Sequence, residues 1–321
     1  DLMKEAVTRY YDVTEFVICL GGARVGESFS KLHLDHLLYV GSNKIAKKVL
    51  LNSSKNLVPT TLELGGKSPV IVDSTAGVKS TAMKIAWGKY LNAGQVCIAP
   101  DYLLIEDKIA DQFTKEFESR ITQMFGNNPI DSDDLGMIVN KAHYNRILKL
   151  IKDAMKDGAK LHVPGGVLEL GEERRKIAPC FLTNCTTDMA IMKEEIFGPV
   201  LPILTWGSTG EVFRTVDLNP NPLALYIFSS KRKNIDAFVD KTKAGSTGIN
   251  EVVIQVANPA LGFGGIGTSG IGRANGKHSF DSFSNLRSFV DSTNRPNALP
   301  LTFPPFNKFT VALTRFINKW L

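Results

Sequence analysis

The chain has 321 residues, of which 43% are hydrophobic and 22% are charged, so its composition excludes a disordered protein and allows two domains or one large one. A net charge of +6 is mildly basic, and no run of Lys and Arg indicates a nucleic-acid site, so we expect no nucleic-acid partner. The start of the chain does not resemble a signal peptide, and no apolar run is long enough to span a bilayer.

The first 64 residues alternate between helical and extended patterns. Strands that alternate with helices are typical of parallel βαβ units, so we interpret residues 1–64 as the C-terminal part of a nucleotide-binding domain. Cys19 lies in an apolar run and is expected to be a small core residue. The predicted elements are a helix over Leu2–Tyr11, a buried strand over Phe16–Leu20, a strand over His36–Val40, a helix over Lys44–Asn52 and a strand over Thr60–Leu64.

Residues 65–260 continue the α/β pattern and are predicted to form a second domain. Ile109, Phe113 and Phe117 open an apolar repeat of four residues, which marks one face of a long amphipathic helix. A charged, glycine-rich stretch over Gly165–Arg175 is interpreted as a surface hairpin or loop. The other predicted elements are strands over Pro69–Asp73 and Tyr102–Glu106 and helices over Thr81–Leu91 and Tyr144–Met155.

Residues 261–321 contain a glycine-rich loop, a proline-rich segment and an amphipathic helix. Phe309, Phe316 and Trp320 fall on one face of this C-terminal helix, while Arg315 and Lys319 fall elsewhere. Such a face packs on its own domain, on a dimer partner, or in a membrane interface with its basic residues outside. The sequence leaves all three possibilities open.

The four cysteines show no metal-binding pattern. Cys19, Cys97, Cys180 and Cys185 form no C-x-x-C pair and no arrangement with the five histidines, so no metal site is predicted. Free thiols in a reduced, intracellular compartment are the simplest interpretation, although a bridge between Cys180 and Cys185 stays open.

Two small-residue segments place a carboxylate and a thiol where chemistry could occur. Glu63 lies in Thr61-Leu-Glu-Leu-Gly-Gly-Lys-Ser68, and Cys97 lies in Asn92-Ala-Gly-Gln-Val-Cys-Ile-Ala-Pro100. A thiol with a nearby carboxylate is a nucleophile with a possible base, and glycine pairs let a ligand approach the backbone. Taken alone, a buried core cysteine and a structural ion pair are the commoner explanations.

The residues that flank Glu63 and Cys97 favour a catalytic role for both over a structural one. Together with the run from Ile85 to Tyr102, both segments resemble the aldehyde dehydrogenase superfamily, in particular its class 3, fatty-aldehyde branch. The resemblance implies that the Cys97 thiolate attacks an aldehyde to form a thiohemiacetal. Hydride transfer to NAD, with NADP as the alternative, would leave a thioester that water hydrolyses to a carboxylic acid, with Glu63 as general base.

The resemblance also implies a cofactor site and a fold. Gly41 and Ser42 end a predicted strand before a helix whose first amides could bind a pyrophosphate, although the family's later glycine is Ala46 here. The implied cofactor contacts are Gly41, Ser42, Leu64, Glu195 and Phe197, the last two within Glu195-Ile-Phe-Gly-Pro199. The implied fold is α/β: a partial Rossmann-type domain, a catalytic α/β domain and a C-terminal arm.

The glycine-rich loop departs from the family pattern at several positions. Gly262 stands where the family usually has Pro, Thr268 where class 3 usually has Asn, and Ala274-Asn275 where a Tyr-His pair is usual. These departures affect the placement of a substrate. The resemblance further implies a long-chain aliphatic aldehyde, a homodimer, and peripheral contact with an organelle membrane through the C-terminal helix.

Part of the family pattern has no counterpart in this sequence. The N-terminal half of the nucleotide domain and the upstream Asn of the oxyanion hole are absent, and loss of one such donor costs about 10²–10³ in rate. We therefore expect weak or no activity from this chain alone and an unpaired sheet edge. A non-catalytic partner of a complete subunit, an esterase that uses Cys97 without nicotinamide, and transfer of the thioester to coenzyme A are the alternatives.

Overall fold

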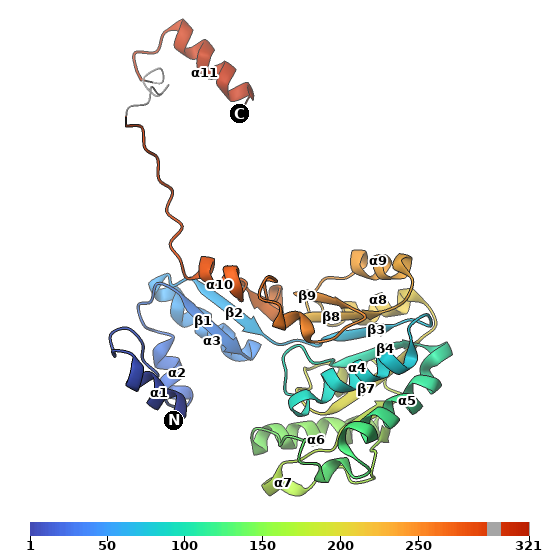
Figure 1. The fold of residues 1–321 in the computed structure, drawn as a ribbon. Helices are drawn as coiled ribbons and strands as arrows, with labels where there is room; N and C mark the ends of the chain where they lie inside the picture. Colours follow the sequence, from blue (N-terminus) through green and yellow to red (C-terminus); the bar gives the residue numbers. More distant parts are fainter. Residues whose placement is uncertain (294–302, 321) are drawn as a thin grey trace. The chain divides into compact units, whose positions relative to one another are not determined.

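A computed structural model describes residues 1–293 and 303–320 (Figure 1). The chain divides into two compact units, Asp1–Phe283 and Ser284–Leu321. The strands of the described residues all lie in the first unit, where they form two sheets. The boundaries predicted after residues 64 and 260 remain predictions.

The larger sheet has seven strands in the order β5-β6-β7-β4-β3-β8-β9. Its strand pairs are parallel except for β5 with β6. The central strands β3 and β8 are apolar and buried along their whole length, as expected of strands covered on both faces. The strands are β3 (Pro69–Val72), β4 (Tyr102–Glu106), β5 (Lys160–His162), β6 (Cys180–Thr183), β7 (Val200–Trp206), β8 (Ala224–Phe228) and β9 (Ser246–Ile249).

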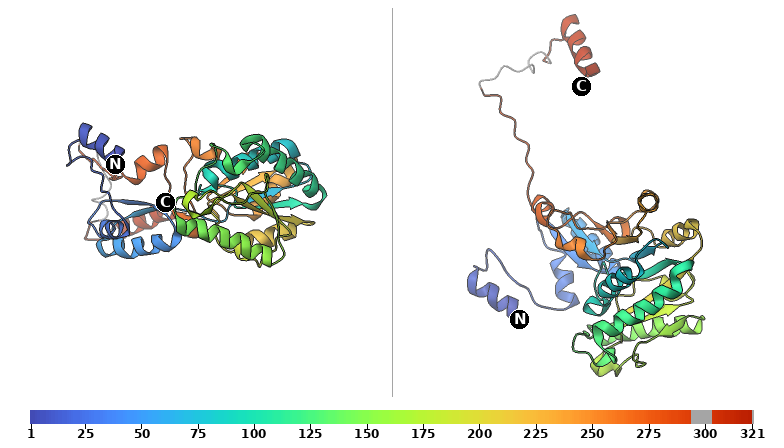
Figure 2. Two further views of the ribbon diagram at one scale, coloured as in Figure 1. Left: turned by 90° about the horizontal axis from the view of Figure 1, so that it is seen from below. Right: turned by 45° about the vertical axis from the view of Figure 1, so that its right-hand side comes forward.

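Helices cover both faces of this sheet (Figure 2). Val70 and Val72 of β3 pack with α4 (Val78–Tyr90) and α5 (Asp107–Phe125) in one apolar core. Ile71, which alternates with them, belongs to the core on the opposite face. That second core also contains residues of α6 (Lys141–Lys156), α8 (Thr209–Asp217) and α9 (Arg232–Lys241).

The smaller sheet carries one half of the candidate site. β1 (Leu37–Gly41) pairs in parallel with β2 (Thr60–Leu64), and β10 (Gly270–Ile271) pairs with β2 in antiparallel orientation. The helix α3 (Asn43–Ser53) connects β1 to β2. Among the described residues β1 pairs only with β2, and its Val40 is 68% exposed, so the expected unpaired edge is present.

The predicted strand over Phe16–Leu20 is wrong. The segment has no regular secondary structure, Phe16, Val17 and Leu20 are all exposed, and Cys19 is exposed rather than a core residue. A strand must pair its N–H and C=O groups with a neighbour, and the described residues provide none for this segment. An apolar run alone was therefore insufficient.

The other predicted elements are confirmed within a few residues. The stretch interpreted as a hairpin or loop contains one short helix, α7, and an isolated antiparallel bridge between Glu169 and Ile177. The remaining helices are α1 (Leu2–Tyr10), α2 (Ala23–Phe29), η1 (Ser54–Asn56), η2 (Leu91–Gly94), η3 (Pro129–Asp131), α7 (Gly171–Arg174), η4 (Ala190–Met192), η5 (Ile254–Ala257), η6 (Gly267–Ser269) and α10 (Gly276–Ser282).

The second unit contains the predicted C-terminal helix, α11 (Lys308–Trp320). Asn307 caps it, because its side-chain oxygen accepts hydrogen bonds from the amides of Phe309 and Thr310, both at 2.9 Å. Phe309 and Phe316 expose most of their surface. No helix in the described part of the chain is long and apolar enough to cross a membrane. Most of the predicted proline-rich segment lies outside the described residues.

Candidate active site

Glu63 is a buried carboxyl group on the central strand of the smaller sheet. It is 6% exposed and lies in register with Val40 on one side and Gly270 on the other. The described residues offer neither of its carboxylate oxygens a hydrogen-bond partner. Burial raises its pKa to about 7, and the positive charge of Arg273 opposes this rise. A carboxyl group with such a pKa can both accept and release a proton near neutral pH.

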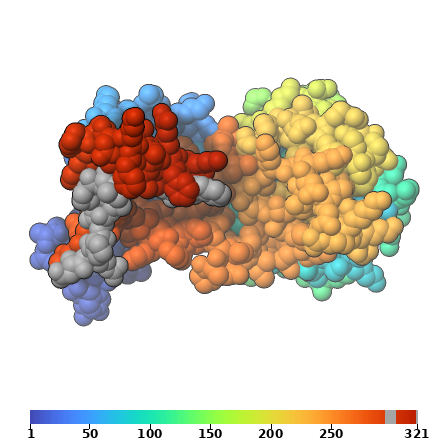
Figure 3. Space-filling view, turned by 90° about the horizontal axis from the view of Figure 1, so that it is seen from above, coloured from blue at the N-terminus to red at the C-terminus, as the bar shows by residue number. Residues whose placement is uncertain are grey.

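The glycine-rich loop packs over Glu63. A Cβ atom on Gly264 would lie 3.0 Å from Oε1 of Glu63 and 3.1 Å from Nη1 of Arg273. Arg273 donates a hydrogen bond from Nη1 to the carbonyl oxygen of Gly265 at 2.7 Å, which fixes the guanidinium beside the loop. Figure 3 shows this orange segment between the blue surface of the smaller sheet and the gold surface of the larger one. Sequence reasoning missed Arg273, although it directly follows the loop.

Cys97 lies in the turn that follows α4 and η2. The turn is tight, with Asn92 and Ala93 in the left-handed region at φ 51° and 54°. Gln95 holds it from outside, donating to the carbonyl oxygens of Asn92 and Met137 at 3.1 and 3.2 Å. The sequence therefore builds a rigid turn that presents a half-buried thiol.

The thiol of Cys97 is protonated at neutral pH. Burial raises its pKa to about 11, and the negative charges of Glu195 and Glu63 add to the rise. The backbone amides of Cys97 and Ile98 oppose it. A Cβ atom on Gly65 would overlap the Glu195 carboxylate, and one on Gly94 would lie 2.3 Å from the carbonyl oxygen of Gly198. The fold therefore brings together the segments of Glu63, Cys97 and Glu195, which are far apart in the sequence. A base must remove the thiol proton before this cysteine acts as a nucleophile.

Glu195 and Phe197 lie in the loop before β7. A Cβ atom on Gly65 would overlap the carboxylate of Glu195, so a side chain at this position would displace that carboxylate. Burial raises the pKa of Glu195 to about 7, the charge of Asp101 adds to the rise, and a hydrogen bond from the Gly66 amide opposes it. Phe197 adopts φ 50°, a left-handed conformation that costs a bulky residue energy.

Gly41 and Leu64 are the last residues of β1 and β2, next to Glu63 in the smaller sheet, and Ser42 follows Gly41. Gly41 ends β1 in register with Leu64, which is buried. Ser42 is the N-cap of α3, yet its side chain makes no capping hydrogen bond. The first-turn amides of this 11-residue helix are the groups that bind anions at helix N-termini. The buried Ala46, which replaces the family's glycine, packs with Leu62 and Leu64 in a small apolar cluster.

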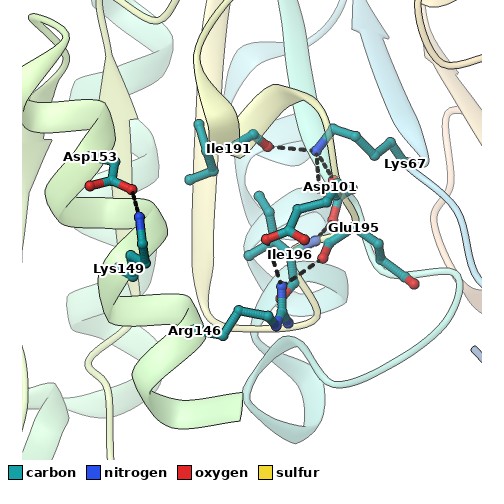
Figure 4. Close-up of polar contacts among 9 residues, drawn as sticks. Lys67, Asp101, Arg146, Lys149, Asp153, Ile191, Glu195 and Ile196 are labelled. Carbon is teal, nitrogen blue, oxygen red and sulfur yellow. Dashed lines mark hydrogen bonds and ion pairs between the residues drawn. The ribbon is translucent and has the colours of Figure 1, made fainter. Parts of the chain in front are cut away.

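Sequence reasoning also missed a network of charged side chains beside Glu195 (Figure 4). Lys67 and Asp101 form a buried ion pair, and Arg146 contacts the same loop from α6. The strings that made Glu63 and Cys97 candidates contain Lys67 and, in the run from Ile85 to Tyr102, Asp101. However, only the folded chain shows that both side chains meet a third segment.

Within the described residues no group of three His, Cys, Asp or Glu side chains could hold a metal ion. All four cysteines are free, so the bridge between Cys180 and Cys185 that the sequence left open is absent.

Residues 12–289 match the model of the aldehyde dehydrogenase family. The 4,4'-diaponeurosporen-aldehyde dehydrogenase of Staphylococcus aureus is 38% identical over 99% of this chain and 68% of its own length. Aldehyde dehydrogenase family 3 member A2 of Pongo abelii is 35% identical over 98% of this chain and 64% of its own length. The dimeric NADP-preferring aldehyde dehydrogenase of Mus musculus is 36% identical, over 95% and 66%. The chain thus spans about two-thirds of the length of these relatives.

A solved structure, the substrate-bound state of Staphylococcus aureus AldH, superimposes with a TM-score of 0.91 at 36% identity. It matches 98% of this chain, which covers 68% of that protein. The α/β fold expected from the resemblance is therefore confirmed, and so is the likeness to class 3 enzymes. On the matched sequence and the shared fold, the chain belongs to the aldehyde dehydrogenase family.

Proposed function

We propose that this chain oxidises an aldehyde to a carboxylic acid with NAD or NADP, using Cys97 as nucleophile and Glu63 as general base. The observation that carries the proposal is the pairing of a protonated thiol with a buried carboxyl group. Glu63 has no hydrogen-bond partner among the described residues and has a pKa of about 7. A carboxylate held in this way has no structural partner to satisfy and is free to take a proton.

The chain's own residues account for each proton. Glu63, as the carboxylate, takes the Cys97 proton, directly or through one water, and the thiolate forms a C–S bond to the aldehyde carbon. Loss of hydride, with its electron pair, leaves an acyl group on Cys97. Glu63 releases this first proton to solvent and then removes a proton from water, whose oxygen replaces the sulfur. The departing thiolate takes that proton back from Glu63 as the acid is released. The backbone amides of Cys97 and Ile98, which already oppose the rise in the pKa of the thiol, are suited to stabilise negative charge there.

The residues present fit the dinucleotide that the family uses. The first-turn amides of α3 and Ser42 suit its phosphates, and Glu195 with Phe197 would hold the ribose and the nicotinamide ring. A side chain at Gly65 would displace the Glu195 carboxylate, so the glycine allows this ligand-binding group to keep its place. When bound, the cofactor supplies the acceptor for the hydride.

The proposal extends to a long-chain aliphatic aldehyde, a homodimer and a reduced intracellular location. The free thiols support the reduced compartment. One relative carries "dimeric" in its name, which supports the dimer. The apolar, aromatic face of α11 supports peripheral contact with an organelle membrane.

The test of the proposed function is reduction of NAD and of NADP by the folded 321-residue chain with a series of straight-chain aldehydes. We expect reduced cofactor to form only when aldehyde and cofactor are both present. Hydrolysis of a nitrophenyl ester without cofactor is measured in parallel. Ester hydrolysis without aldehyde oxidation would limit the activity to thiol chemistry. Folded protein without either activity would contradict the proposal and favour a non-catalytic partner.

Removal of residues 307–321 is expected to release the protein from vesicles of phosphatidylcholine and phosphatidylserine. This deletion takes away α11, whose Phe309 and Phe316 are exposed and would enter the interface beside the basic Arg315 and Lys319. Co-sedimentation with vesicles measures the bound fraction, which we expect to fall at least about fivefold. A Phe309→Ser/Phe316→Ser variant keeps the basic residues and should weaken binding as well. Equal binding by the full and shortened chains would contradict the membrane proposal.

A further inference from the structure

We propose that Lys67, Asp101 and Arg146 are positioning residues that together hold the 191–196 loop, and with it Glu195 and Phe197, in place against the Cys97 turn. We call these three side chains the brace. The inference rests on the proposed function, because it assigns the brace a role in hydride transfer rather than in the thiol chemistry alone.

Lys67 and Asp101 each lie four residues after a candidate catalytic residue. Lys67 follows Glu63, and Asp101 follows Cys97. Their side chains form an ion pair and are only 3% and 5% exposed. The amide of Asp101 also donates to the carbonyl oxygen of Ser68 at 2.8 Å. The segment after the base and the segment after the nucleophile are therefore joined by a backbone bond that needs no brace side chain.

Side chains, rather than a backbone–backbone bond, hold the 191–196 loop against these two segments. Lys67 donates from Nζ to the carbonyl oxygens of Ile191 at 2.8 Å and Glu194 at 3.0 Å, while Asp101 Oδ1 accepts from the Ile196 amide at 2.9 Å. The ion pair thus satisfies backbone groups on a third segment, distant in sequence from both partners (Figure 4). Because both charges are buried, each requires the other and the loop to be in place.

Arg146, on α6, donates hydrogen bonds to the 191–196 loop as well. Its two terminal nitrogens donate to the carbonyl oxygens of Glu195 at 3.0 Å and Ile196 at 2.6 Å. One of them also lies 3.5 Å from the Glu194 carboxylate. The planar guanidinium suits two adjacent carbonyl oxygens in a way that a lysine ammonium does not.

Among the described residues, no backbone–backbone hydrogen bond from another segment reaches residues 191–196. Outside the brace, the Gly66 amide donates to the Glu195 carboxylate, and the Asn219 side chain donates to the carbonyl oxygen of Met192 at 3.0 Å. Brace side chains therefore satisfy the main-chain groups of Ile191, Glu194, Glu195 and Ile196. The loop leads into Phe197, whose left-handed backbone persists only where its surroundings over-determine it. The brace is therefore expected to fix the cofactor side of the site, while backbone contacts fix the thiol side.

The first test is amide hydrogen exchange of the whole chain, followed in the peptide that covers residues 191–198. We expect Asp101→Ala, Lys67→Met and Arg146→Met each to speed exchange in this peptide about tenfold or more, with β3 and β4 unchanged. Because Arg146 is partly exposed, we expect Arg146→Met to fold even if a variant at the buried Lys67 or Asp101 does not. Figure 4 also shows the matched control, Lys149→Met, which breaks an exposed ion pair with Asp153 on the same helix.

The second test compares two rates in the same variants. We expect the ratio of aldehyde oxidation to ester hydrolysis to fall about tenfold or more, with the KM for the cofactor rising. Arg146→Lys should restore little of this ratio, because a point charge cannot serve both carbonyl oxygens. A residue that merely stabilises the fold would lower both rates together.

The two readouts separate this inference from the proposed function. If no aldehyde oxidation occurs, hydrogen exchange still decides whether the brace holds the loop. Unchanged exchange at residues 191–198 in Arg146→Met and in one folded buried variant would overturn the inference. Faster exchange throughout the first unit, or parallel loss of both rates, would overturn it as well, because the three residues would then serve the whole fold.

Discussion

Replacement of Cys97 with alanine is expected to abolish aldehyde oxidation and to lower thiol-dependent ester hydrolysis by about 10⁴-fold or more. The thiol is the group that forms the covalent bond in both reactions, and alanine has no nucleophilic atom. Steady-state rates of cofactor reduction and nitrophenol release measure the loss. A fluorescence or circular dichroism melt confirms that the variant is folded.

The other cysteines provide matched controls for this variant. Cys19 is exposed and Cys185 is half-buried near β6, so Cys19→Ala and Cys185→Ala remove a free thiol away from the site. Both are expected to retain the wild-type rates within about twofold. Retention of ester hydrolysis by Cys97→Ala, or its loss in Cys19→Ala, would show that a different thiol carries the reaction.

Replacement of Glu63 with glutamine is expected to lower ester hydrolysis about 10²–10⁴-fold at neutral pH. Glutamine keeps the shape of the side chain but cannot accept the Cys97 proton. In the wild-type protein the rate should rise with pH through about 7, because the base is active only when ionised and its pKa is about 7. The rise in rate near pH 7 should be absent in Glu63→Gln.

The same substitution has a predictable effect on stability. Folding raises the pKa of Glu63 from 4.5 to about 7, so the carboxyl group contributes stability below 4.5 that is lost as the pH rises through 7. Glutamine carries no charge at any of these pH values. The Tm of the variant relative to the wild type should therefore increase between pH 5 and pH 8, as measured by thermal melts at both values.

Two other carboxyl groups test whether these effects belong to Glu63. Glu251 pairs with Lys84 on a half-exposed surface, so Glu251→Gln should change the rate and the pH profile little. Glu195 also has a pKa of about 7 and lies near Cys97. If the step near pH 7 persists in Glu63→Gln and disappears in Glu195→Gln, then Glu195 is the base and the assignment of Glu63 is wrong.

The candidate site was partly readable from the sequence. Short strings around Glu63, Cys97 and Glu195 made all three candidates, because each string contains glycine and has a specific order of residues. Arg273 could not be identified in this way, because its significance is its proximity to Glu63 across the glycine-rich loop. The brace was hidden for the same reason, since Lys67 and Asp101 meet residues 191–196 only after folding.

The sequence by itself determined the family, most helices and strands up to α6, the C-terminal helix, and the candidates for the nucleophile and the base. Apolar periodicity and turn residues are local properties, so they predict elements such as β4 and α5 almost residue by residue. Tertiary structure alone decided that the run Phe16–Leu20 forms no strand, because strand formation depends on a neighbour that supplies hydrogen-bond partners. It also decided the pKa values of Glu63 and Cys97, because burial and distant charges act through space and not along the chain.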